Sequence, residues 1–237
     1  MKKVLTGIFL LLYLFSVVQE IPTPIPATIY SETESIAQAG ADLENVCLSA
    51  PGSATKNVQT AAQKIVRRGI PAEAFENITV YIVPTEVFPE GTKDVGCDAV
   101  GFAVSKRGEI WLAGRSENIE GTFAHEFGHI LADRLFGSVG YDWSEVSLSG
   151  WHYMRLKGYP VENGLHWTFQ QEMKWKDRIA EWFAEDFEFY IFRDEKYHTA
   201  GPKPTKEIMQ FFDMLWQEFP AFSRTHTVGR RRGRECS

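Results

Sequence analysis

The residues best suited to chemistry form the pentapeptide His125-Glu126-Phe127-Gly128-His129. Two histidines four positions apart project from the same face of an α-helix, so both imidazoles can reach one metal ion. The glutamate between them can approach an open coordination position without being a ligand itself. This H-E-x-x-H spacing predicts a catalytic zinc site, with His125 and His129 as ligands and Glu126 as the general base.

A catalytic zinc ion takes three protein ligands and keeps a fourth position open, so a third ligand must come from elsewhere in the chain. The H-E-x-x-H-x-x-G-x-x-H arrangement is absent, because Ala132 and Leu135 stand where it requires Gly and His. A downstream predicted helix offers Glu181 and Glu185, four residues apart on one face. One can bind the ion while the other accepts a hydrogen bond from a ligating imidazole.

The elements that must position these residues follow from hydrophobic periodicity. Helices are predicted over residues 55–68, 119–135, 178–193 and 205–219, and strands over residues 79–83, 100–105 and 109–112, the last two forming a hairpin. The H-E-x-x-H helix is expected to begin after Ser116 or Asn118 and to end at Gly137. Residues 138–176 are expected to form a long ordered connection with little regular structure. This order of elements predicts one α+β domain.

The segment Glu181-Trp182-Phe183-Ala184-Glu185-Asp186-Phe187 resembles the E-x-F-A-E-x-F signature of the gluzincin metallopeptidase domain at the C-terminus of anthrax lethal factor and its relatives. The resemblance extends loosely from residue 79 onward. It implies a zincin-like metallopeptidase domain with a small mixed sheet, an H-E-x-x-H active-site helix and C-terminal helices. It also implies that His125, His129 and Glu181 bind one zinc ion, that Glu126 is the general base, and that Glu185 supports the ligands.

Two implications of the resemblance concern the substrate. The hairpin that ends in Ile110-Trp111-Leu112 would be the edge strand above the cleft, pairing antiparallel with an extended peptide. The family places a tyrosine seven residues before its glutamate ligand to stabilise the oxyanion, whereas this chain has Lys174 there. The alternatives for that role, all from the 138–176 connection, are Tyr141, His152, Tyr153, Tyr159 and His166.

The predicted helix over residues 178–193 carries two further acids, Asp186 and Glu188. We expect these two to form part of a solvated acidic stripe. Glu181 and Glu185 are expected to be enclosed instead, because aromatic residues crowd the same helix and leave little of it open to water.

The N-terminal segment differs from the rest of the chain. Lys2 and Lys3 precede a 15-residue, mostly apolar run, which has the layout of a secretory signal peptide and is shorter than a bilayer-spanning helix of about 20 residues. No small-x-small triplet follows it closely, so an uncleaved N-terminal anchor is the alternative. The predicted organisation is a signal peptide or anchor over residues 1–20, a proline-containing spacer over 21–40, a zinc metallopeptidase domain over 41–222 and a basic tail over 223–237.

Charge narrows the class of partner. The chain has 25 Lys and Arg against 31 Asp and Glu, and between residues 4 and 229 the count is 19 against 30. So acidic a body disfavours nucleic acid and anionic membranes and confines membrane contact to an uncleaved N-terminal anchor. The expected partner, a peptide or protein substrate, follows from the predicted metallopeptidase site. Export would permit a disulfide between Cys47 and Cys97, with Cys236 left over.

Two functions compete on this evidence. The first is an exported zinc-dependent endopeptidase, secreted or membrane-anchored, in which Glu126 activates a zinc-bound water to hydrolyse a peptide bond. The second is a catalytically inactive zinc-binding protein of the same fold that acts as a binding or inhibitory module. The intact Glu126 favours the first function, and Lys174 in place of the family's tyrosine favours the second.

Overall fold

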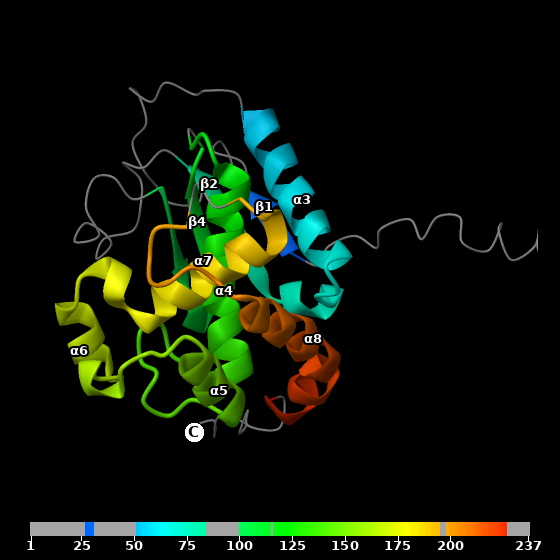
Figure 1. The fold of residues 1–237 in the computed structure, drawn as a ribbon. Helices are drawn as coiled ribbons and strands as arrows, with labels where there is room; N and C mark the ends of the chain where they lie inside the picture. Colours follow the sequence, from blue (N-terminus) through cyan, green and yellow to red (C-terminus); the bar gives the residue numbers. More distant parts are fainter. Residues whose placement is uncertain (1–26, 31–50, 84–99, 115, 195–197, 227–237) are drawn as a thin grey trace, which may run out of the picture.

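The computed structural model describes residues 27–30, 51–83, 100–114, 116–194 and 198–226 (Figure 1). The predicted signal peptide or anchor, the three cysteines and residues 227–237 of the basic tail lie outside these ranges. The described part is α+β, with a small mixed sheet and several helices, in agreement with the predicted class. Within it, no helix is long and apolar enough to cross a membrane.

The sheet has four strands in the order β1-β2-β4-β3. β2 (Ile78–Val83) pairs in parallel with both β1 (Ala27–Tyr30) and β4 (Glu109–Ala113), and β3 (Gly101–Val104) pairs antiparallel with β4. The predicted hairpin is therefore confirmed, its strands joined by the 3-10 turn η4 (Ser105–Arg107). The sequence predicts three strands, and β1 adds a fourth inside the segment predicted as a spacer. Four residues after a proline-rich stretch are too few to show the period-2 alternation by which strands are recognised.

The edge of the sheet differs from what the family resemblance implies. β4 is paired on both sides, so Ile110-Trp111-Leu112 does not form an edge strand. Among the described strands, β3 pairs only with β4, in the register that sets Gly101 opposite Leu112, and its other side is the edge. A peptide that extended this sheet would pair with β3.

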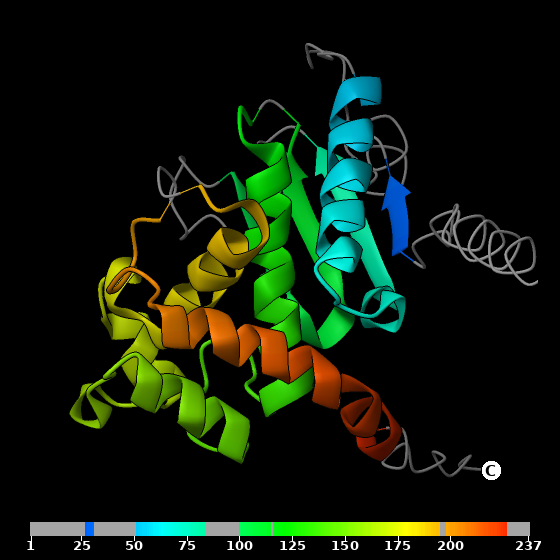
Figure 2. The ribbon, with the colours of Figure 1, turned by 45° about the vertical axis from the view of Figure 1, so that its right-hand side comes forward.

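Helices α3 (Pro51–Arg67) and α4 (Ile119–Phe136) cover one face of the sheet (Figures 1 and 2). The alternating residues Ile78, Val80 and Ile82 of β2 are buried beneath them. The predicted amphipathic helix over residues 55–68 is α3, which begins four positions earlier than expected. The hydrophobic core lies between the sheet and these two helices and extends to aromatic residues farther along the chain, among them Phe183, Phe187 and Phe212.

The H-E-x-x-H helix, α4, has the limits that the sequence predicts. Asn118 is its N-cap, and the side-chain oxygen of Asn118 accepts a hydrogen bond of 3.2 Å from the Gly121 amide. At the other end Gly137 adopts a left-handed conformation with a φ of 78°, which a residue without a Cβ adopts most easily. Both ends of the helix that carries the histidines are therefore defined by local chemistry.

Helix α7 (Ile179–Phe192) packs against α4, which is consequently enclosed between the sheet and α7 (Figure 2). Helix α8 (Lys206–His226) follows and packs on α7. Gly128 allows the close approach of α4 and α7, since a Cβ at this position would stand 3.1 Å from the Cα of Ala184. The small residues at this crossing bring the two halves of the predicted metal site together.

Residues 138–176 are more regular than predicted. They contain α5 (Leu148–Leu156), α6 (Trp167–Glu172) and the 3-10 turns η5 (Val161–Asn163) and η6 (Trp175–Asp177). The longest of these elements has nine residues, too few for a clear hydrophobic period. The buried side chain of Trp143 helps to fix the connection on the core.

Replacing Gly128 tests the helix crossing. We expect Gly128→Val to lower the free energy of unfolding by about 2 kcal/mol or more, because a branched side chain would press on the Ala184 backbone. Gly128→Ala should cost less, since alanine gains up to about 1 kcal/mol of helix propensity over glycine. Denaturant unfolding of the metal-free variants provides the measurement, and a valine variant as stable as the parent protein would contradict the packing argument.

Candidate metal centre

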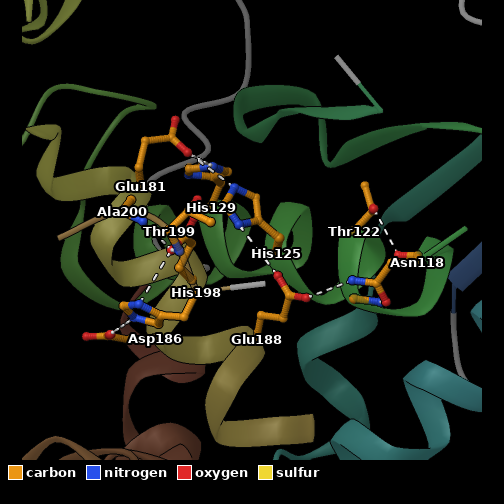
Figure 3. Close-up of polar contacts among 12 residues, drawn as sticks. Asn118, Thr122, His125, His129, Glu181, Asp186, Glu188, His198, Thr199 and Ala200 are labelled. Atoms are coloured by element: carbon orange, nitrogen blue, oxygen red, sulfur yellow. Dashed lines mark hydrogen bonds and ion pairs between the residues drawn. The ribbon is translucent and has the colours of Figure 1, made fainter. Parts of the chain in front are cut away.

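The structure brings the three predicted zinc ligands together. His125 and His129 project from α4 toward Glu181 in the first turn of α7 (Figure 3). The Oε2 atom of Glu181 lies 3.2 Å from Nε2 of His125 and 3.6 Å from Nε2 of His129. One ligand atom from each residue can be chosen such that all three lie within 4.8 Å of one another.

These three residues fit a zinc ion. Zinc bonds of about 2.1 Å in a tetrahedral arrangement separate neighbouring ligand atoms by about 3.4 Å, close to the two distances measured from Glu181. Two imidazoles and one carboxylate are also a donor set of catalytic zinc sites that keep a position open. Glu181 is only 1% exposed, and a carboxylate so buried requires a cationic partner.

His125 and Glu181 form a buried ion pair at the candidate metal centre. Burial alone would lower the pKa of His125, but its hydrogen bond with Glu181 and the nearby carboxylates of Glu126 and Glu188 raise that pKa to about 10. Burial alone would raise the pKa of Glu181, yet the imidazoles of His129 and His125 hold it well below its ordinary range. A proton therefore occupies the place between imidazole and carboxylate that a cation would take.

Glu126, the predicted general base, is buried beside the ligands and against the sheet. Burial raises the pKa of its carboxyl group despite the neighbouring histidines, and a carboxyl group whose pKa lies above its ordinary value is suited to acid–base chemistry. A Cβ at Gly101, in strand β3, would stand 3.2 Å from Oε1 of Glu126. Glycine at this position lets the edge strand approach the base closely.

Glu185 contacts the loop after α7, and no described contact joins it to the ligating imidazoles. Its Oε1 atom accepts a hydrogen bond of 2.8 Å from the Thr199 hydroxyl, and its Oε2 atom accepts hydrogen bonds from the amides of Thr199 and Ala200. Nδ1 of His198 also lies 3.7 Å from Oε2 of Glu185. The structure thus brings Glu185 to the loop and not to the metal group.

The expectation that Asp186 is solvated is wrong. Asp186 is fully buried and accepts hydrogen bonds from the Tyr153 hydroxyl at 2.8 Å and from the Lys157 ammonium at 2.9 Å. Its Oδ1 atom also lies 2.8 Å from Nε2 of His198. A paired lysine and a phenol make this burial possible, and both come from α5 or its C-terminal end, which the sequence does not predict.

The expectation that Glu188 is solvated is also wrong. Glu188 is 9% exposed, and it accepts a hydrogen bond of 3.1 Å from the side-chain amide of Asn118. Its other oxygen lies 4.0 Å from Nδ1 of His125. Seven positions, two helical turns, separate Glu181 from Glu188, so both project from the face of α7 that meets α4. The seven-residue spacing of Glu181 and Glu188 is the one feature of the sequence that indicates that Glu188 lies near the metal ligands.

Of the five alternatives for an oxyanion-binding side chain, Tyr141 lies beside the metal group. Its ring centroid is 6.3 Å from that of His129, and burial and the Glu181 carboxylate raise the pKa of its hydroxyl. The Arg178 guanidinium packs 4.8 Å from the Tyr141 ring centroid. The other four contact residues elsewhere: Tyr153 binds Asp186, Tyr159 binds Gln170, His166 faces Asp142 and His152 packs near Phe211.

Aromatic side chains that the sequence does not assign to the site form its outer wall. The Trp175 ring, in η6, lies 6.4 Å from that of His125 and is 43% exposed. Trp167, in α6, lies 5.7 Å from Tyr141 and is also exposed. An apolar surface thus borders the candidate metal centre on the side of the 138–176 connection.

No protein-family model and no curated protein sequence matches this chain. The chemical capacity of the site is therefore argued from its geometry. It combines three donors for a divalent cation, a buried carboxylate next to them and a phenol beside His129. These groups are the parts that metal-assisted hydrolysis requires.

Metal binding should depend on pH in a defined direction. Below about pH 10 the metal-free protein carries the His125 proton, which zinc must displace, so acid weakens binding. We expect affinity to rise about tenfold per pH unit between pH 6 and pH 8, with at least one proton released per zinc. Calorimetric titrations in two buffers of different ionisation enthalpy measure that release. His166→Ala, which removes an exposed imidazole, should leave it unchanged, and zero release at pH 7 would contradict the ion pair.

Proposed function

We propose that this protein is an exported zinc-dependent peptidase with a zincin-like fold, similar to the gluzincins. One observation carries the proposal, namely the convergence of His125, His129 and Glu181 with Glu126 beside them. The first and third ligands are 56 positions apart, so their meeting is a property of the helix packing and not of local sequence. The N-terminal signal-like segment supports export, either as a secreted or as an anchored protein.

The chain's own residues divide the work of peptide hydrolysis. When bound, zinc supplies Lewis-acid polarisation of a carbonyl and lowers the pKa of water. Glu126 takes a proton from the attacking water and returns it to the departing amine, the task for which its buried position suits it. The Tyr141 hydroxyl donates a hydrogen bond to the oxygen of the carbonyl under attack, since its raised pKa keeps it protonated.

The sheet offers a place for an extended substrate. Strand β3 forms the edge nearest Glu126, and Gly101 brings its backbone against the carboxylate. A peptide that pairs with this edge would lie across the metal group between β3 and the aromatic wall of Trp167 and Trp175. A peptide or protein is therefore the proposed partner, in keeping with the acidic charge of the chain.

The first test of the function is Glu126→Gln. We expect zinc to remain bound in one equivalent while cleavage of a fluorogenic peptide library falls by about 10²–10⁴-fold, because the amide cannot accept the proton. Glu162→Gln, which alters an exposed glutamate in η5, should leave both properties unchanged.

Two results would contradict the assignment of Glu126. A fully active Glu126→Gln variant would show that another group accepts the proton. A wild-type protein that binds zinc but cleaves no peptide would favour the alternative of a catalytically inactive zinc-binding module.

The second test is Tyr141→Phe, which keeps the ring against His129 and Trp167 and removes only the hydroxyl. We expect kcat to fall by about 10²-fold or more, as on removal of one oxyanion donor, with KM and zinc affinity nearly unchanged. Tyr159→Phe provides the control, because that hydroxyl binds Gln170 and should affect stability alone. Equal activity in the two variants would remove Tyr141 from the mechanism.

A further inference from the structure

We propose that Glu188, held in place by Asn118, is the residue that positions the zinc ligand His125. The inference rests on the proposed zinc site, and it replaces the part expected of Glu185. It makes Glu188 a positioning residue, since it acts through the imidazole and touches no reacting atom.

The argument starts from the two nitrogens of the His125 ring. Nε2 faces Glu181 at 3.2 Å, and Nδ1 faces Oε2 of Glu188 at 4.0 Å, so carboxylates two turns apart on α7 flank the ring on both sides (Figure 3). A histidine that binds a metal through Nε2 carries its proton on Nδ1. At 4.0 Å the Glu188 carboxylate contacts Nδ1 electrostatically, and its negative charge on this side of the ring favours the Nδ1 proton and the orientation in which Nε2 faces Glu181.

Glu188 is in turn fixed by the start of helix α4. The Asn118 amide nitrogen donates to Oε1 of Glu188 at 3.1 Å, while the amide oxygen caps the helix by accepting from the Gly121 backbone. Because the side-chain oxygen of Asn118 caps the helix, its amide group cannot flip without breaking the cap hydrogen bond. The donor toward Glu188 is therefore determined by the helix cap.

Gly121 makes room for this pair. A Cβ at this position would stand 2.2 Å from both the Asn118 amide nitrogen and Oε1 of Glu188. The helix cap, Glu188 and the His125 ring thus form a continuous chain of contacts from the end of α4 to the metal group. Glu185, whose oxygens are engaged by Thr199 and Ala200, has no place in this chain.

The direction of the Asn118–Glu188 hydrogen bond allows a sharp test. In Glu188→Gln alone, the donor of the new amide group faces either the Asn118 amide or the His125 Nδ1–H. In Asn118→Asp alone, two carboxylates face each other. We expect each to weaken zinc binding by about 10–100-fold. In the double variant Asn118→Asp/Glu188→Gln the new amide donates to the new carboxylate, and its oxygen still faces His125. We expect zinc affinity to return to within about fivefold of the wild type.

Two readouts separate positioning from general stability. Zinc affinity is measured by competition with a chelator, and the His125 tautomer by ¹⁵N NMR of the zinc-loaded protein, with Nδ1 protonated in the wild type. Glu185→Gln is the control, because the loss of its contacts with Thr199 and Ala200 should lower the melting temperature and leave zinc affinity unchanged.

Each outcome decides the inference. Unchanged affinity in Glu188→Gln, losses that add in the double variant, or a loss in Glu185→Gln as large as that in Glu188→Gln would overturn it. If the single variants do not fold, the wild-type tautomer decides, and a proton on Nε2 would overturn it. A wild type that binds no zinc refutes the proposed function and the inference together. A rescue of zinc affinity in the double variant, together with a wild type that cleaves no peptide, upholds the inference and refutes only the peptidase.

Discussion

The close packing of helix α4 on helix α7 is the constraint on which the rest of the site depends. Gly128 and Ala184 meet at the crossing, where a larger residue would separate the helices. Glu181 on α7 can reach His125 and His129 on α4 only when the two helix backbones lie this close together. Buried carboxylates are costly without partners, and Glu181 and Glu188 find theirs only when the two helices are packed. Packing and charge pairing therefore stabilise each other.

The four acids of α7 divide into two networks by the groups that they contact. Glu181 and Glu188 face α4 and its histidine, whereas Glu185 and Asp186 hold the loop after α7 and the end of α5. The second network contains Lys157, whose ammonium lies 2.8 Å from Asp186 in a nearly water-free setting. It fixes α7 to the loop that follows it and to the end of α5. One helix thus supplies both the proposed ligand Glu181 and the contacts that hold this helix in place.

What the sequence predicts well follows from short-range geometry. The motif is placed on its helix by the spacing of His125, Glu126 and His129 and by the capping residues. The structure confirms the predicted helix over residues 119–135 and extends it by one residue, Phe136. The role of Glu188 and the wall formed by Trp175 depend on which helix lies beside which, and no local pattern encodes that. The order of the strands is equally non-local. The sequence does not show that β3, and not β4, lies at the edge of the described sheet. The zincin-like fold itself stays a prediction.

The charges at the candidate metal centre explain part of the acidic composition of the chain. Glu126, Glu181 and Glu188 surround two imidazoles, and in the metal-free protein the protonated His125 offsets only part of this negative charge. Exchanging that proton for a divalent cation adds one positive charge where three carboxylates converge, and the geometry of the ligands need not change. The ion pair between His125 and Glu181 spans a distance that also suits two ligands of one zinc ion. Such a site requires its acids to be buried and paired, and not merely abundant.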